Sequence, residues 1–347
     1  MVAAIKKEIG LRRGEWDGQD LKSLYFGGGT PSILTVDELQ SIVDEVLKYY
    51  TFDSEIEITL EANPDDLDQQ FLKGLSKTPF NRLSIGTQSF FDEDLKLMNR
   101  AHNSGEAESS IKRAQDFGFE NISIDLIYGA PTSNFEIWKQ NLDKTIELQV
   151  PHVSSYALTI EPKTALHTWI SQGKIAAPKE AEQHEEFFYM SDFLKGHGFD
   201  HYEISNFGKP GFHSKHNSAY WKYQAYLGIG PSAHSYNGRN ERSWNVANNQ
   251  LYINSLNKGV VPRETEVLAE KEQFNELLMI GLRTTLGVDL SAMRAQFSSE
   301  LLEYFHHEIK SKLEDGLLVI ENDHLVIPEK HWFLADGIAA DLFLVGS

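Results

Sequence analysis

Short apolar runs alternate with longer amphipathic stretches through the first half of the chain. Ile122–Tyr128 is almost wholly apolar, as buried strands are, whereas Val36–Tyr50 places apolar residues at helical spacing. The same pattern predicts strands at Ser23–Gly29, Glu57–Glu61, Arg82–Gln88, Ile122–Tyr128 and His152–Thr159, and helices at 2–13, Val36–Tyr50, Leu67–Ser76, Ser104–Phe117 and Phe135–Leu148. Strands that alternate with helices in this way indicate βα units and a parallel sheet.

Polar or glycine-rich motifs follow each predicted strand at its carboxyl end. Barrels of βα units build their sites from all of these ends, whereas an open sheet binds its ligand mainly at one switch point. The pattern therefore favours an α/β barrel. Because the chain begins with a helix, where such a barrel begins with a strand, we expect a partial barrel whose first strand is missing.

The regular alternation fades after about residue 165. Residues 200–240 are rich in aromatic residues and glycine, and apolar helices are expected at 270–283 and 300–314, followed by a hairpin around Glu321–Asp323. Helices followed by a hairpin indicate a winged-helix-like module. We therefore expect three parts, namely the barrel at 1–165, its completion at 166–262, and a C-terminal α+β domain at 263–347.

Composition narrows the classes of function. The 347 residues carry a formal net charge of −19, which opposes binding to nucleic-acid phosphates. The sequence predicts no membrane-spanning helix and has no signal peptide, so we expect a cytoplasmic protein. The chain contains no cysteine, which excludes disulfides, cysteine nucleophiles and any metal cluster held by its own thiolates.

Candidate binding residues lie where the predicted strands end. Gly27–Gly29 would let backbone N–H groups approach an anion, although tight glycine turns without a ligand are equally common. Glu61 can accept hydrogen bonds from hydroxyl or ammonium groups, or serve as a structural helix cap. Gln88 offers a donor and an acceptor, and Arg100 offers a fork for a carboxylate or is a solvated surface charge. Asp125 lies inside an apolar strand, where a carboxylate needs a partner, which favours a role in binding.

Taken in order, the motifs GGGTP, EANP, GTQSF and DLIYGAP resemble the coproporphyrinogen-oxidase-like radical-SAM family, which includes the HemN and HemW proteins, over nearly the whole chain. The resemblance implies a (β/α)6-type barrel that binds S-adenosylmethionine (SAM). It implies SAM contacts at Gly28, Gly29, Thr30, Glu61, Gln88, Arg100 and Asp125, with Ala157 on the pocket wall. Gly228–Gly230 matches a further pocket-wall position of the family.

The segment HNSAYW, which begins at His216, matches a motif associated with heme binding in the HemW-type branch of this family. A neutral histidine can ligate heme iron, and flanking aromatic rings can pack on a porphyrin face. A histidine beside aromatic residues is more often an ordinary packed residue. The resemblance implies heme contacts at His216, Asn217, Tyr220 and Trp221, with His216 as the iron ligand, and a heme-accepting partner protein that the sequence does not identify.

The sequence departs from the family at its cluster loop. Members of the family carry a CxxxCxxC loop whose thiolates hold a 4Fe–4S cluster, which cleaves SAM, and this loop is missing here. The resemblance begins just after the place of that loop, which we interpret as truncation of a longer chain, with a cluster-free homologue as the alternative. On either interpretation no radical chemistry is expected from the residues present.

The sequence leaves three functions open. The first is a heme-binding chaperone or trafficking protein, which the HNSAYW segment and the absence of cysteine favour. The alternative is an oxygen-independent coproporphyrinogen III oxidase, an enzyme of porphyrin biosynthesis. The third is a barrel that binds another nucleotide-like ligand in the same pocket.

Overall fold

The computed structural model describes residues 1–15 and 20–345. The chain divides into two compact units, each of which is described by itself. The half-barrel unit comprises Lys22–Gln40 and Glu55–Ser214, and the terminal unit comprises Met1–Leu21, Ser41–Ser54 and Lys215–Ser347. Among the described helices, none combines the length and the apolar character that a bilayer crossing requires.

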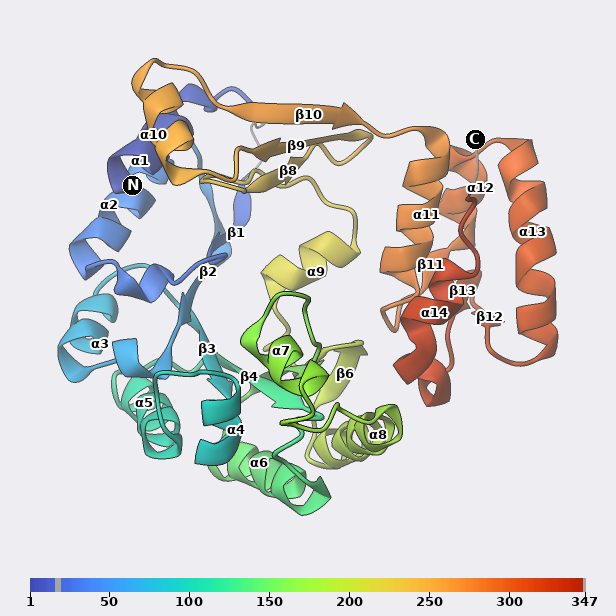
Figure 1. Ribbon diagram of the computed structural model, residues 1–347. Coiled ribbons are helices and arrows are strands. Elements are labelled where there is room, and N and C mark those ends of the chain that lie inside the picture. The colour runs from blue at the N-terminus through green and yellow to red at the C-terminus, as the bar shows by residue number, and fades with distance from the viewer. Residues whose placement is uncertain (16–19, 346–347) are drawn as a thin grey trace. The chain divides into compact units, whose positions relative to one another are not determined.

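A curled sheet of seven described strands organises the half-barrel unit, in the order β1-β2-β3-β4-β5-β7-β6 (Figure 1). The strands are β1 (Leu21–Phe26), β2 (Phe52–Ala62), β3 (Arg82–Gln88), β4 (Ile122–Tyr128), β5 (His152–Ala157), β6 (Asp200–Glu203) and β7 (Asn206–Gly208). Neighbours from β2 to β5 are parallel, whereas β7 runs antiparallel to both β5 and β6. The parallel strands therefore bring their carboxyl ends to one edge of the sheet.

The helices that connect these strands are α2 (Val36–Leu47), α3 (Gln69–Leu75), α4 (Asp92–Leu97), α5 (Ser104–Asp116), α6 (Phe135–Glu147), α7 (Ala165–Ser171) and α8 (Glu180–Gly196), with 3-10 turns η1 (Pro31–Ile33) and η2 (Pro64–Asp66). Helices α3, α5, α6 and α8 cover one face of the sheet (Figure 1). Along β4, Ile124 and Leu126 are fully buried, and Asp125 between them points to the opposite face. On α6, Trp138 and Leu142 are also buried, and each such apolar side chain contributes about 1.5–3 kcal/mol.

Asparagine caps fix where two of these helices begin. The Asn103 side chain accepts a hydrogen bond from the Glu106 N–H at 3.0 Å, and the Glu106 carboxylate accepts one from the Asn103 N–H at 2.9 Å. Asn134 accepts from the N–H groups of Glu136 and Ile137, both at 3.0 Å. Caps of this kind contribute about 1 kcal/mol each and set the ends of the loops that follow β3 and β4.

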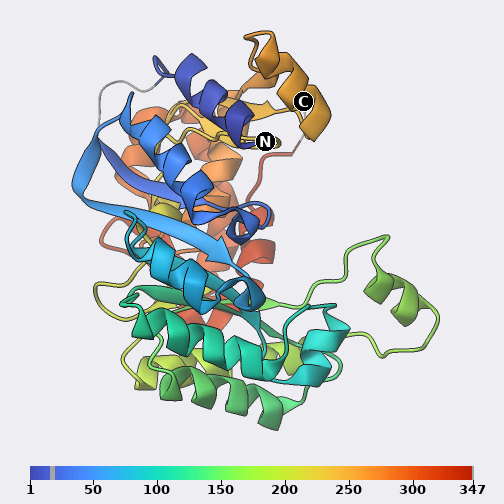
Figure 2. The same cartoon turned by 90° about the vertical axis from the view of Figure 1, so that its left-hand side faces the viewer.

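The segment 158–179, which contains α7, extends as an arm from the body of the half-barrel unit (Figure 2). No residue of α7 is buried. The first residue of the arm, Leu158, is nevertheless held between the end of β4 and the first turn of α8. The Leu158 N–H donates to the Tyr128 carbonyl at 2.8 Å, and Gln183 Nε2 donates to the Leu158 carbonyl at 3.2 Å.

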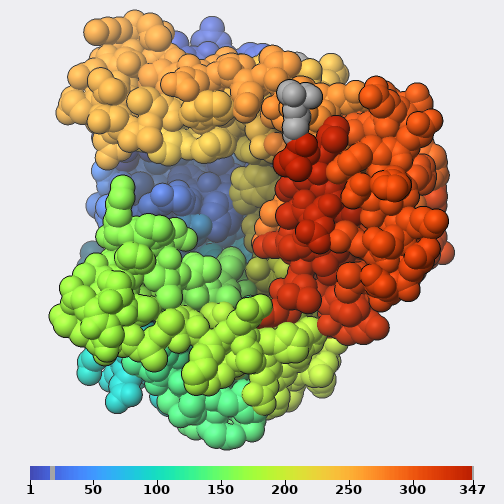
Figure 3. Space-filling model, turned by 45° about the vertical axis from the view of Figure 1, so that its right-hand side comes forward, coloured from blue at the N-terminus to red at the C-terminus, as the bar shows by residue number. Residues whose placement is uncertain are grey.

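The terminal unit combines segments from both ends of the chain. Its helices are α1 (Val2–Leu11), α9 (Lys215–Trp221), α10 (Asn249–Asn257), α11 (Glu270–Gly281), α12 (Leu290–Gln296), α13 (Ser299–Glu314) and α14 (Ala335–Ala340), with the 3-10 turn η3 (Glu329–Leu334). One sheet has the order β10-β9-β8, and the other has the order β11-β13-β12. Their strands are β8 (His234–Tyr236), β9 (Glu241–Asn245), β10 (Arg263–Val267), β11 (Val288–Asp289), β12 (Val319–Glu321) and β13 (His324–Val326). The C-terminal helices form one continuous packed body, coloured orange to red (Figure 3).

A buried polar network ties α1 to the rest of the terminal unit. Glu8 is fully buried, and its carboxylate accepts hydrogen bonds from the Gly230 N–H at 2.9 Å and from Asn245 Nδ2 at 2.7 Å. The Tyr252 hydroxyl also donates to Glu8, and the guanidinium of Arg12 pairs with it at 3.2 Å. The charge of Glu8 is thus compensated on several sides, as a buried carboxylate requires.

The structure confirms the predicted α/β fold with a partial barrel. The strands predicted at 82–88 and 122–128 coincide with β3 and β4. Helices α11 and α13, followed by the β12–β13 hairpin, confirm the predicted order of elements near the C-terminus. Helices α4 and α8 and the antiparallel β6–β7 pair were not predicted. The three-part division of the chain stays a prediction.

Candidate functional site

The glycine turn after β1 and the end of β2 meet through one carboxylate. Gly28 has φ +79°, which favours glycine, and its N–H donates to Glu61 Oε2 at 3.2 Å. The Tyr25 hydroxyl donates to Glu61 Oε1 at 2.6 Å. A Cβ at Gly27 would lie 2.6 Å from Glu61 Oε1, so a side chain there would displace the carboxylate. The glycines therefore let Glu61 lie against the β1 turn.

Arg100 lies across the carboxyl ends of β2 and β3. Its Nη2 donates to Asn63 Oδ1 at 2.7 Å and to the Gly86 carbonyl at 3.2 Å. Gln88, the last residue of β3, has φ 64°, a left-handed conformation that is uncommon outside glycine. A Cβ at Gly86 would lie 3.1 Å from Arg100 Nη2 and 3.2 Å from Gln88 Nε2. The polar ends of Arg100 and Gln88 therefore both lie close to Gly86.

Asp125 on β4 completes this group of charges. Burial and, secondly, the nearby Glu61 carboxylate raise the pKa of Asp125 to about 7, against the opposing effects of Arg100 and of a hydrogen bond from Ser84. Burial and the charge of Asp125 also raise the pKa of the Tyr156 hydroxyl on β5. Two carboxylates that repel one another at a strand edge favour a ligand that brings positive charge.

The other predicted contacts lie at the same edge. Gly29 and Thr30 lie between β1 and η1, and Ala157 is the last residue of β5, in register with Tyr128 at the end of β4. The structure thus brings the predicted SAM contacts from Gly28 to Ala157 to the carboxyl ends of β1 to β5. Their role in binding SAM stays a prediction.

Sequence reasoning missed three polar residues of this group. Tyr25 orients Glu61, Asn63 holds Arg100, and Tyr156 lies near Asp125. A signal was available for Asn63, because it belongs to the EANP motif. Tyr25 was read only as part of an apolar strand, although period-two alternation places it on the same face as Gly27.

The residues predicted for heme lie on α9 in the terminal unit. Burial lowers the pKa of His216 to about 4, so that its imidazole is neutral at pH 7. The rings of His216 and Tyr220 meet edge to face at 5.0 Å, and Tyr220 meets Tyr226 in the same way at 4.7 Å. Asn217 lies in the first turn of α9, and Trp221 ends the helix. A neutral histidine beside tyrosine rings is thus present, and its role as an iron ligand stays a prediction.

Residues Gly228–Gly230 are held by α1. Arg12 Nη1 donates to the Gly228 carbonyl at 2.7 Å, and Glu8 accepts from the Gly230 N–H at 2.9 Å. A Cβ at Gly228 would lie 1.9 Å from the His234 carbonyl oxygen, so this close approach of two backbones requires glycine. These contacts give the segment a structural role, and its place on the wall of the SAM pocket stays a prediction.

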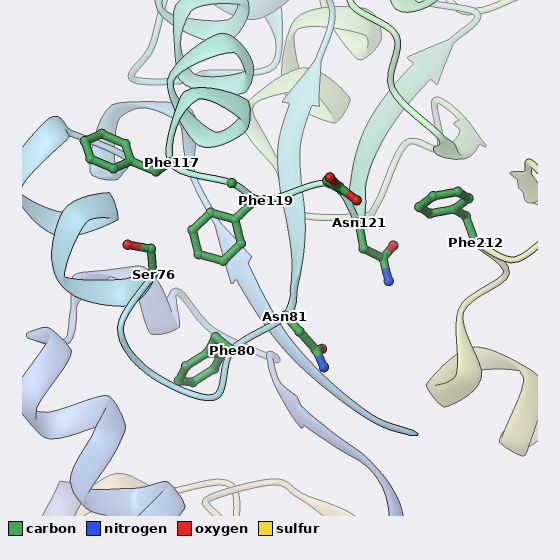
Figure 4. Close-up of a pocket in the computed structure, with 9 residues that line it drawn as sticks. Ser76, Phe80, Asn81, Phe117, Phe119, Asn121 and Phe212 are labelled. Carbon is green, nitrogen blue, oxygen red and sulfur yellow. The ribbon is translucent and has the colours of Figure 1, made fainter. Parts of the chain in front are cut away.

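A pocket of about 340 Å³ lies at the opposite end of the strands (Figure 4). Phe80 and Phe119 line it from the loops that precede β3 and β4, with Asn81 and Asn121 beside them and Phe212 facing them. The Asn81 side chain already accepts a hydrogen bond from the Ile58 N–H of β2, at 2.8 Å. In βα barrels this amino-terminal end serves stability, so the pocket is not the candidate site.

Comparison with known proteins decides the family. The sequence profile of the Radical SAM superfamily matches residues 3–144, and that of the HemN C-terminal domain matches residues 268–334. The heme chaperone HemW of Bacillus subtilis (strain 168) is 35% identical over 301 residues, which cover 86% of this chain and 79% of that protein. The chain belongs to the HemW-type radical-SAM family.

Relatives of this HemW-type chain extend to animals. The mitochondrial radical S-adenosyl methionine domain-containing protein 1 of Bos taurus is 32% identical, over 87% of this chain and 71% of that protein. Among solved structures, coproporphyrinogen III oxidase (HemN) from Escherichia coli has a TM-score of 0.82 at 22% identity, covering 98% of this chain and 82% of that one. At this level of identity the likeness establishes the fold of the HemW-type chain.

The radical-SAM family implies SAM and a 4Fe–4S cluster, and the residues present fit only the first. The N–H of Gly28, the carboxylates of Glu61 and Asp125, and the guanidinium of Arg100 suit the charged groups of SAM. The HemW-type chain supplies no thiolate for a cluster, since it contains no cysteine. Within residues 1–15 and 20–345, no group of three or more histidine, aspartate or glutamate side chains is arranged to hold a metal ion.

Proposed function

We propose that this chain is a heme-binding chaperone or trafficking protein that also binds SAM in its half-barrel unit. The observation that carries the heme assignment is the neutral, half-buried His216 on α9, whose ring meets that of Tyr220 and whose pKa burial lowers to about 4. Heme iron takes a neutral imidazole, so no proton has to leave His216 at pH 7 before it ligates iron. Tyr220 packs against this ring and offers an aromatic surface for the porphyrin.

The relatives support the same assignment. The Bacillus subtilis protein, at 35% identity, is named a heme chaperone. A chaperone releases its ligand to another molecule, so the proposal includes an acceptor protein for heme. In the proposed complex, His216 ligates the iron, and Asn217, Tyr220 and Trp221 contact the porphyrin or orient α9.

The charges at the strand edge support SAM as the second ligand. SAM carries an ammonium group, a sulfonium and a carboxylate, together with ribose hydroxyls. Glu61 and Asp125 complement the cationic and hydroxyl groups, and the fork of Arg100 complements the carboxylate. In the proposed complex, Gly28, Gly29 and Thr30 line the turn beside SAM, and Gln88 and Ala157 complete the wall of the pocket.

In this proposal the residues of the chain bind and orient heme and SAM. Reductive cleavage of SAM needs an electron from a cluster, for which the chain has no thiolate ligands. The proposal therefore assigns no radical step to the residues present. The carboxylates, the arginine and the histidine hold and orient their ligands.

Hemin titration followed by absorption spectroscopy tests the heme assignment. We expect a shifted Soret band with the wild-type protein and loss of that shift in His216→Ala. His306→Ala is the matched control, because His306 lies exposed on α13 and should leave the spectrum unchanged. An unshifted band in the wild type, or an unchanged band in His216→Ala, would contradict the assignment.

Calorimetric titration with SAM tests the pocket. We expect Glu61→Gln and Asp125→Asn each to weaken binding about 10-fold or more, since each removes a charged hydrogen-bonding partner that is typically worth about 1.5–3 kcal/mol. Glu120→Gln removes an exposed carboxylate at the opposite end of the sheet and serves as the control. The pocket assignment fails if Glu61→Gln and Asp125→Asn bind SAM as tightly as Glu120→Gln and the wild type do.

A further inference from the structure

The helix α9 meets one face of α11 in the C-terminal part of the terminal unit. The guanidinium of Arg283, which follows α11, lies 5.7 Å from the centroid of the Trp221 ring at the end of α9. Tyr223 follows α9, and its pKa is raised by burial and, secondly, by the Glu276 carboxylate on α11. Glu276 lies within α11, and Arg283 lies in the turn two residues beyond its last residue, Gly281. Helix α11 and the turn that follows it therefore both lie near the end of α9.

Glu276 also holds the β8–β9 hairpin. Its Oε1 pairs with Arg242 Nη1 at 2.6 Å, and the Arg242 guanidinium lies 5.7 Å from the centroid of the Tyr236 ring. The rings of Tyr236 and Tyr223 meet edge to face at 6.3 Å. Glu276 thus joins three elements at one point, namely α11, the hairpin and the turn after α9.

Two features of this junction between α11, the β8–β9 hairpin and the turn after α9 destabilise the folded state. Tyr223 has φ 53°, a left-handed conformation that is strained for a bulky side chain. In the described part of the chain, no hydrogen-bond partner is found for four of the buried polar atoms at the junction, Trp221 Nε1, Tyr223 Oη, Arg242 Nε and Glu276 Oε2. Apolar side chains of similar size would pack here without these costs. Strained backbone and unsatisfied polar groups of this kind gather at functional positions.

The junction connects to His216 through ring contacts. His216 meets Tyr220 at 5.0 Å, Tyr220 meets Tyr226 at 4.7 Å, and the Tyr226 ring lies 6.3 Å from that of Tyr236. Tyr236 in turn lies under Arg242, the partner of Glu276. His216 and Tyr220 are four residues apart and share one face of α9, whereas Trp221 lies about 100° further round the helix. His216 and Tyr220 thus lie on one face of α9, and Trp221 lies on another, which meets the end of α11.

We propose that Glu276 and Arg283 are positioning residues that set the orientation of α9, and with it the His216 imidazole, for a porphyrin ligand. The inference rests on the proposed heme site. It assigns to the C-terminal domain a part in ligand geometry: Arg283 packs against Trp221, and Glu276 holds Arg242, which lies over the Tyr236 ring that contacts Tyr223.

The test compares Glu276→Gln, Arg283→Gln and Arg283→Lys with Arg294→Gln, the control. Arg294 lies on α12 of the same domain in an exposed pair with Asp323. We expect Glu276→Gln and Arg283→Gln to weaken hemin affinity about 5–10-fold and to move the Soret band toward that of free hemin. Arg283→Lys should recover only part of the shift, because an ammonium lacks the planar guanidinium that stacks on Trp221. Arg294→Gln should match the wild type.

Hydrogen exchange in the ligand-free protein gives a second readout that does not depend on heme. Amides of 215–221 should exchange faster in Glu276→Gln and Arg283→Gln than in the wild type or in Arg294→Gln, at similar melting temperatures. Equal exchange of these amides in all four proteins would overturn the inference, as would an equal loss of hemin binding in Arg294→Gln. A wild-type protein that shows no Soret shift, but shows the expected exchange pattern, would instead refute the proposed function and retain the positioning role for α9.

Discussion

Binding of SAM should release a proton from Asp125. In the free protein the pKa of Asp125 is raised to about 7, first by burial and then by Glu61, with Arg100 and Ser84 opposing. A raised pKa means that Asp125 is largely protonated below pH 7 and ionised above it. The sulfonium and ammonium groups of SAM favour the ionised carboxylate, so the pKa falls on binding and the proton leaves. The affinity for SAM should therefore rise as the pH rises through 7.

The size of the effect follows from the shift. With a free pKa near 7, about 91% of Asp125 is protonated at pH 6 and about 9% at pH 8. If the pKa returns to its ordinary range in the complex, the dissociation constant should be about 10-fold lower at pH 8 than at pH 6, or about 1.4 kcal/mol. At pH 9 there should be almost no further gain, because Asp125 is then already ionised in the free protein.

Calorimetry at pH 6, 7 and 8, in buffers of different ionisation enthalpy, measures both the affinity and the number of protons released. Asp125→Asn should abolish the pH dependence. Asp116→Asn, a charge removal on the exposed end of α5, should leave it intact. Infrared titration of the ligand-free protein reports the carboxyl of Asp125 directly. The reasoning is refuted if this carboxyl is fully ionised at pH 6, or if the affinity of the wild type for SAM is the same at pH 6 and pH 8.

Three further predictions concern buried polar groups. Burial raises the pKa of Glu186 from its ordinary value of 4.5 to about 7, so the cost of ionising it in the folded state grows as the pH rises from 4.5 to 7 and is complete above 7. Glu186→Gln should therefore raise the free energy of unfolding in urea by about 3 kcal/mol at pH 8 and by about half as much at pH 5.5, and no gain at pH 8 would contradict the assignment. Arg12→Met leaves the fully buried Glu8 without its cationic partner and should cost about 3–5 kcal/mol in the same assay; a cost below 1 kcal/mol would show that the pair is dispensable. Tyr25→Phe removes the hydroxyl that orients Glu61 and should weaken SAM binding about 3–10-fold with little change in melting temperature, whereas unchanged affinity would exclude that role for Tyr25.

The strand edge was predictable because its signals are local. A run of apolar residues marks β4, and the polar exceptions within or after each run, such as Asp125 and Glu61, identify the face and the end of the sheet where a ligand belongs. Period-two alternation is enough to separate Asp125 from Ile124 and Leu126. The fold class followed from the same alternation of strands and helices.

What was missed depends on contacts that local patterns do not encode. Helix α8 buries Glu186 beside Phe187, which blurs its apolar stripe. The β6–β7 pair is formed by two very short strands, and β7 pairs with β5 across the long segment that includes α7 and α8. The part that Arg283 plays beside Trp221 joins residues 62 positions apart in sequence, and no periodicity of either segment indicates it.

The anchoring of α1 has a consequence for synthesis on the ribosome. Glu8 finds its partners Gly230, Asn245 and Tyr252 more than 220 residues later in the chain. At about 5–20 residues per second, the ribosome needs on the order of tens of seconds to synthesise the residues between Glu8 and these partners. During this delay α1 lacks the residues of the terminal unit against which it packs, whereas β2 to β5 can already pair with one another. The half-barrel should therefore fold before the terminal unit closes, and α1 should be among the last elements to be buried.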